Sequence, residues 1–240
     1  MRHSVYSIFF EQADGREATA HWSEALALLY QAQRWAHEDA SYWIRLGLVS
    51  LRMAEPAWLG AEGLLGTHTG DMAALNAELY LERAARLAPG DPAPAFWRAW
   101  TMHRTGRATA AVRQALDEAL ARNPRWPYAL ALLGRLELAE REPGHAARAQ
   151  EAATAACQAL PESPRLHYDL GAALAAVGDA RGARAAFHRA VTLAPLTRPP
   201  GVAGGWLDEA FHGQPGQLRA WVEAYYGEVL GGDPPPTPRP

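Results

Sequence analysis

Residues 164–197 read PRLHYDLGAALAAVGDARGARAAFHRAVTLAPLT, and this stretch decides the fold. Its apolar residues recur three and four positions apart, which is the spacing of one helix face. Gly178-Asp179 breaks the pattern into two helical halves. Small residues in the two halves, Gly171 and Ala183, would let an antiparallel helix pair pack closely, with Phe187 filling the gap beside them. We therefore predict a helix–turn–helix unit.

The same features recur along the chain with an almost constant period. Prolines that cannot continue a helix fall at Pro89, Pro124, Pro161 and Pro195, in steps of 35, 37 and 34 residues. Small residues follow the same phase, on the first helices at Gly47, Ala99, Gly134 and Gly171 and on the second helices at Ala77, Ala111, Ala146 and Ala183. Three markers in one phase indicate an array of repeats.

This pattern resembles the tetratricopeptide repeat, a helix–turn–helix of about 34 residues. The resemblance implies an all-α fold, an α-solenoid of helix–turn–helix repeats. We expect the array over residues 41–195 and a degenerate N-terminal repeat over residues 1–40. A glycine-rich insertion at residues 55–71 would explain the long 52-residue step from Gly47 to Ala99.

Composition shifts after the array. We expect a linker and a C-terminal capping helix within residues 196–232, because the last repeat of a solenoid would otherwise expose its stacking face. Within Pro215–Leu230, one helical face gathers Leu218, Trp221, Val222, Tyr225 and Val229. The proline-rich residues 233–240 are expected to be a disordered tail.

Charge and hydropathy narrow the classes of partner. The 240 residues hold 23 basic and 26 acidic side chains, and every basic one is arginine. Without a basic excess we expect no nucleic-acid partner, and without lysine no Schiff-base chemistry. No apolar stretch is long enough for a membrane span, and Ser4–Phe10 is too short for a signal peptide. We expect a cytoplasmic protein with no membrane partner.

Catalytic and metal-binding patterns are weak. The nine histidines show no zinc-peptidase spacing, and the single cysteine, Cys157, reads as a small buried hydrophobe. His167 falls on a packing position of its repeat. We expect no enzyme, no metal and no cofactor. A weaker alternative is an enzyme or sensor that uses the 55–71 insertion and His68.

The resemblance implies a partner-binding site on the first helices, which line the concave face of such arrays. Carried over by position, the lining residues are Ile44, Leu48, Phe96, Trp100, Arg104, Tyr128, Arg135, Arg165 and Tyr168. Aromatic residues and arginine are the types that dominate binding hot spots. One alternative stays open, because a shift of one residue would move Phe96 or Trp100 into the core between helices. The family's lysine–asparagine clamp for chaperone tails has no counterpart in a chain without lysine.

These features favour a non-enzymatic adaptor or scaffold whose groove binds a peptide or a partner helix of apolar and acidic character. The alternative is a self-associating or autoinhibited module, whose groove is filled by its own residues 196–240 or by a second copy in a homo-oligomer.

Overall fold

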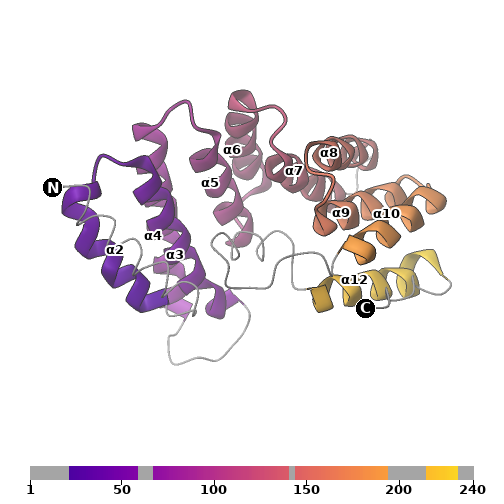
Figure 1. The fold of residues 1–240 in the computed structure, drawn as a ribbon, viewed down its shortest axis with the longest axis horizontal. Coiled ribbons are helices and arrows are strands. Elements are labelled where there is room, and N and C mark those ends of the chain that lie inside the picture. The colour runs from indigo at the N-terminus through magenta and orange to yellow at the C-terminus, as the bar shows by residue number, and fades with distance from the viewer. Residues whose placement is uncertain (1–21, 59–66, 141–143, 194–214, 232–240) are drawn as a thin grey trace. The chain divides into compact units, whose positions relative to one another are not determined.

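The computed structural model describes residues 22–58, 67–140, 144–193 and 215–231 (Figure 1). Every regular element within these ranges is a helix, and within each of two units consecutive helices pack against each other, so the chain is an all-α solenoid. Its contacts divide it into unit 1, Met1–Pro124, and unit 2, Arg125–Pro240. None of the described helices combines the length and the apolar character needed to cross a bilayer.

Within its described residues, unit 1 contains two close helix pairs preceded by one further helix. In chain order its helices are α2 (Trp22–Ala36), α3 (Ala40–Trp58), α4 (Thr67–Leu87), α5 (Pro92–Arg104) and α6 (Thr109–Arg122). Helices α3 and α4 form one pair and α5 and α6 the other, while α2 packs on α3 and α4 packs on α5. Each pair is one helix–turn–helix repeat.

Unit 2 continues the same arrangement. Its helices are α7 (Pro127–Ala139), α8 (His145–Ala159), α9 (Pro164–Ala176), α10 (Ala180–Leu193) and α12 (Pro215–Tyr225), the last continued by a π-helical turn, Tyr226–Leu230. Helix α9 packs on both members of the preceding pair, α7 and α8. Helix α12 packs on α9 and α10 in the same way, so it stands where the first helix of another repeat would stand.

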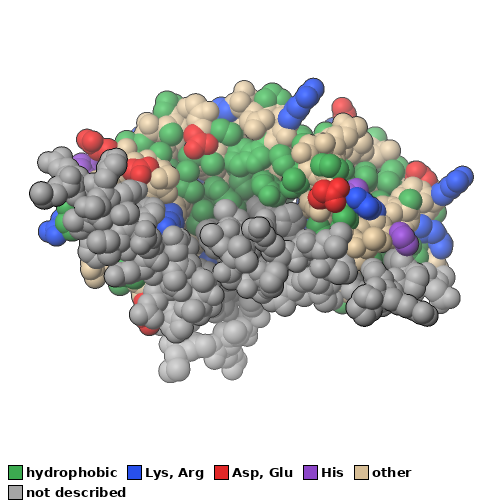
Figure 2. Space-filling model, in the orientation of Figure 1, with side chains coloured by type: hydrophobic (Ala, Val, Ile, Leu, Met, Phe, Trp, Pro, Cys, Tyr) green, Lys and Arg blue, Asp and Glu red, His purple; other side chains and the backbone are tan. Residues whose placement is uncertain are grey.

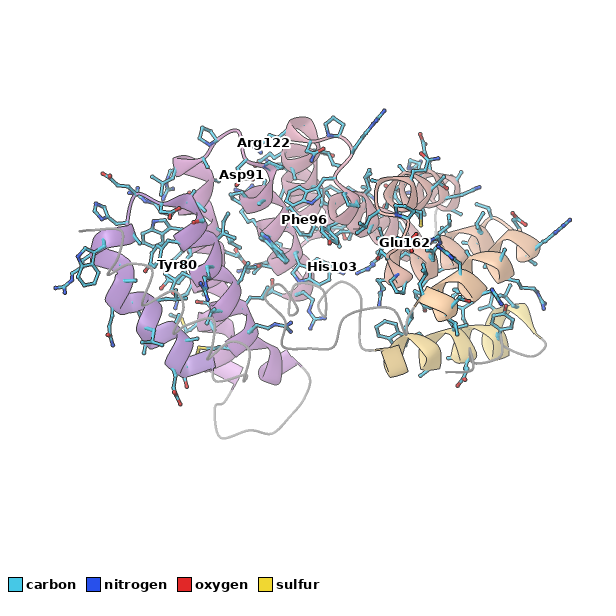
Figure 3. All side chains as sticks on the ribbon, viewed as in Figure 1. Tyr80, Asp91, Phe96, His103, Arg122 and Glu162 are labelled. Atoms are coloured by element: carbon cyan, nitrogen blue, oxygen red, sulfur yellow. The ribbon has the colours of Figure 1, made fainter. Side chains whose placement is uncertain are left out.

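A capping side chain and a proline set the starts of α5 and α9. The Asp91 carboxylate accepts a hydrogen bond from the Ala93 amide at 2.8 Å, and Pro92 opens α5. At the same end of the α5–α6 pair, Arg122 donates to the Pro89 carbonyl at 2.6 Å (Figure 3). These bonds satisfy polar groups at the helix ends and hold the pair in register.

Close helix packing at the small residues is confirmed. A Cβ atom added to Gly171 would lie 2.7 Å from the Phe187 ring, and one added to Gly47 would lie 2.9 Å from Cγ of Leu81. Neither position has room for a side chain. The first and second helices therefore pack closely at these two glycines, while a Cβ atom on Gly134 would lie at an ordinary contact distance of 3.4 Å.

In two repeats, the small residue predicted to be buried on the second helix is the wrong one. Ala111 and Ala146 are only partly buried, and the buried positions are Val112 and Ala149 instead. The reason is turn length: four residues separate α5 from α6 and five separate α7 from α8, against three between α9 and α10. Each added turn residue moves the following helix out of the expected phase.

Several expected boundaries shift or lie outside the described residues. Helix α3 continues to Trp58 and α4 begins at Thr67, so helices enter the 55–71 insertion from both sides. Its middle, residues 59–66, is outside the described ranges, as are most of the degenerate repeat and the 233–240 tail. At the other end of the chain Val229 is exposed, which corrects its expected place on the packed face of the cap.

Candidate functional site

Two arginines in unit 2 converge on one carboxylate. Arg135 of α7 donates from Nε and Nη2 to Oδ2 of Asp169 at 3.0 and 2.7 Å, and Arg165 donates from Nε to Oδ1 at 3.2 Å. The Asp169 side chain is 7% exposed, and the arginine side chains are 17% and 16% exposed. Two guanidinium groups therefore share one carboxylate in a mostly desolvated place.

Two aromatic rings lie against Arg165. The Arg165 guanidinium carbon lies 4.4 Å from the ring centre of Trp221 and 5.3 Å from that of Tyr168. Such geometry is favourable for a cation over an aromatic face. Burial lowers the pKa of Arg165 and raises the pKa of Tyr168. Arg165 still keeps its charge at neutral pH, because an arginine does not lose its proton in proteins.

The structure brings three of the expected lining residues together in unit 2. Arg135, Arg165 and Tyr168 form the cluster just described, which we call the arginine pair site together with Asp169 and Trp221. Tyr128 lies at the first turn of α7 and is partly exposed.

In unit 1 the expected lining is largely buried. Leu48 is 3%, Phe96 0% and Trp100 6% exposed, so these three side chains are buried, and their role in a partner-binding lining stays a prediction. Phe96 packs edge-on against Trp97, with ring centres 5.0 Å apart. Helix α5 buries several faces at once, and apolar spacing alone does not distinguish a groove face from a core face.

The remaining unit 1 residues of the expected lining differ in exposure. Ile44 is partly buried and packs against the core of α2 and α3. Arg104 is exposed at the end of α5, next to His103. Phe96 lies nearer the start of the same helix (Figure 3). On the face drawn in Figure 2, described acidic and basic side chains are interspersed with hydrophobic ones.

Sequence reasoning missed Asp169, although two signals pointed to it. It follows Arg165 by four residues on one helix, which is a favourable ion-pair spacing. It also follows Arg135 by 34 residues, which is one repeat period and therefore an adjacent first helix.

A second polar cluster that was missed joins α7 to α8. Nδ1 of His145 lies 2.6 Å from Oε2 of Glu137 and 3.2 Å from Oε2 of Glu140, and Arg148 donates from Nε to Glu137 at 2.9 Å. Glu137 and His145 are buried, so the cluster joins α7 to α8 through the Arg148–Glu137 ion pair and the close contact of His145 with Glu137. Across the described ranges, no three acidic, histidine or cysteine side chains are arranged to hold a metal ion.

Cys157 is a buried thiol, as expected. Burial raises its pKa to about 12, and its sulfur lies 4.0 Å from Nδ1 of His167. His167 sits at its packing position with Nε2 2.8 Å from the Pro161 carbonyl. Because the thiolate is the reactive form, burial disfavours reactivity of this cysteine.

Comparison with known proteins identifies the fold. No family model and no curated protein matches the sequence. Among solved structures, MamA residues 41 to the end from Desulfovibrio magneticus RS-1 matches with a TM-score of 0.56 at 15% identity, over 81% of this chain and 97% of that one. A crystal structure of MamA protein matches with a TM-score of 0.53 at 16% identity, over 79% and 92%. MamA is a tetratricopeptide-repeat protein, and the packed helix pairs with their period near 34 residues agree with that likeness. The chain has the tetratricopeptide-repeat fold.

Proposed function

We propose that this chain is a non-enzymatic interaction adaptor that binds a protein segment of apolar and acidic character through the arginine pair site of unit 2. The observation that supports it is the sharing of one carboxylate, Asp169, by Arg135 and Arg165 beside Trp221 and Tyr168.

Charge and geometry explain why such a site would select an acidic segment. Arginine offers a planar fork of donors that matches a carboxylate, and its bonds to charged acceptors are the stronger kind. Asp169 accepts hydrogen bonds from both guanidinium groups and holds both in place. Tyr168 and Trp221 add apolar area beside the charge, which is the combination found at binding hot spots.

Replacing Arg165 with glutamine is expected to weaken partner binding about 10-fold, because it removes one of the two guanidinium groups that would bind a carboxylate. The fold is expected to survive, since Arg135 still gives Asp169 two hydrogen bonds. Replacing both arginines with alanine would instead leave the buried carboxylate alone, so the single variant is the cleaner test. The full chain is immobilised, exposed to extract of its source organism, and the retained proteins are quantified.

The matched control for this experiment is Arg189→Gln. Arg189 lies on α10, is about half exposed and pairs with the exposed Glu162 at 3.3 Å. The Arg189→Gln substitution changes the net charge by the same amount as Arg165→Gln, but outside the arginine pair site. Equal retention by the native chain, Arg165→Gln and Arg189→Gln would refute the proposed role of the arginine pair site.

The second candidate function is an autoinhibited module. The observation in its favour is that Trp221 belongs to the C-terminal helix α12 and covers Arg165 at 4.4 Å. In this reading the chain's own C-terminal segment occupies part of the binding surface until a partner displaces it.

Trp221→Ala separates the two candidates. If α12 blocks the site, the variant is expected to retain several-fold more partner in the same assay, because Arg165 becomes accessible. If Trp221 instead forms part of the binding surface, retention is expected to fall. Light scattering on both proteins shows whether a second copy fills the surface, since self-association would raise the mass.

A further inference from the structure

Exposed apolar side chains gather on the second helices of unit 1. On α4, Met72 is 57%, Leu75 42% and Leu79 60% exposed. Their spacing of three and four residues places them on one face of the helix. On α2, Tyr30 is 43% exposed. We call these four residues the α4 patch.

The α4 patch spans two helices that touch. The hydroxyl groups of Tyr30 and Tyr80 lie 2.9 Å apart, which brings α2 against α4 at the level of Leu79. Elsewhere in the described ranges, Val177 and Val229 are the large apolar residues with comparable exposure, and each stands singly. Single exposed apolar residues are ordinary, whereas a contiguous group of them marks an interaction surface.

Positive charge lies at one end of the patch. Arg83 follows Leu79 by one helical turn, and Arg34 follows Tyr30 by one turn, with its guanidinium carbon 3.7 Å above the Trp35 ring. Neither arginine forms an ion pair with another described residue. Arg86, the next arginine of α4, is held by Glu82 at 2.6 Å, so the charge left over at this end is positive.

We propose that the α4 patch docks a partner helix whose apolar stripe is followed, one turn later, by a carboxylate. Apolar side chains of the partner would cover Met72, Leu75 and Leu79, while its carboxylate would meet Arg83. An amphipathic helix with such a stripe is a standard way of binding an apolar surface. This surface lies on the second helices of unit 1, so the inference is independent of the arginine pair site in unit 2.

The test uses a labelled synthetic helical peptide with leucines spaced three and four residues apart and glutamates in the next turn. A matched peptide carries lysines in place of the glutamates. Fluorescence anisotropy with the full chain is expected to show about 10-fold tighter binding of the glutamate peptide, because charge complementarity to Arg83 favours it. Arg83→Glu is expected to reverse that preference.

Leu79→Glu is expected to lower the affinity for the glutamate peptide about 10-fold. Circular dichroism checks that this exposed substitution leaves the fold intact. Val177→Glu, at an exposed apolar position in unit 2, is the matched control and should leave binding unchanged. Equal affinity for both peptides, or no effect of Leu79→Glu, would overturn the inference. A doubled mass in light scattering that Leu79→Glu abolishes would also overturn it, because the occupant would then be a second copy.

Discussion

Phe187→Ala is expected to lower the free energy of unfolding of unit 2 by about 3–5 kcal/mol. The ring is fully buried and lies against Gly171, with ring centres 5.5 Å from Tyr168, 5.0 Å from Tyr225 and 6.1 Å from Tyr226. It thus joins α9, α10 and α12, and its loss leaves a cavity where three helices meet. Urea denaturation followed by tryptophan fluorescence measures the change.

The control is His188→Ala, which truncates the exposed neighbour of Phe187 on α10. Exposed substitutions of this kind change stability by about 0.5 kcal/mol or less. If Phe187→Ala cost no more than His188→Ala, the ring would not be the element that holds the three helices together.

Gly171 offers a sharper check of the same contact. Alanine is normally better than glycine inside a helix by about 0.5–1 kcal/mol. Here its Cβ would lie 2.7 Å from the Phe187 ring, so Gly171→Ala is expected to destabilise the native chain. In the Phe187→Ala background, Gly171→Ala is expected to stabilise the protein, because the ring that its Cβ would meet is gone. Such a change of sign arises only if the two positions interact directly.

The contact between Gly171 and Phe187 was predictable from sequence because both residues lie within one repeat. Their separation depends only on helix geometry and one short turn, and the period of the array confirms which positions face each other. The same reasoning placed Gly47 against the second helix of its pair. Contacts inside a repeat are local, so a regular pattern is enough to predict them.

Turn length and burial were not predictable in the same way. One extra turn residue before α6 buries Val112 in place of Ala111, and a single sequence does not show which turn is longer. Phe96 and Trp100 have the apolar character of either a groove or a core, and the structure buries both. Asp169 looked like an ordinary surface charge, because a carboxylate reveals its partners only when adjacent repeats are superposed.

Asp169→Ala is expected to destabilise unit 2 by about 3 kcal/mol, the cost of leaving buried charge without its counterion. The variant removes the carboxylate that accepts three hydrogen bonds from Arg135 and Arg165, both of them more than four-fifths buried. Two neighbouring guanidinium groups would then repel each other in a place with little water. Urea denaturation should show the transition at clearly lower denaturant than in the native chain.

Glu162→Ala is the matched control, because it breaks an ion pair with Arg189 whose two side chains are 71% and 48% exposed. Exposed pairs contribute about 0–1 kcal/mol, so this variant should unfold close to the native midpoint. A rescue variant, Asp169→Leu with Arg135→Met and Arg165→Met, removes the carboxylate and both guanidinium groups and fills the space with apolar atoms, so it should recover most of the loss. Two results would show that desolvated charge is not what makes Asp169 necessary. One is an Asp169→Ala variant as stable as Glu162→Ala, and the other is a rescue variant less stable than Asp169→Ala.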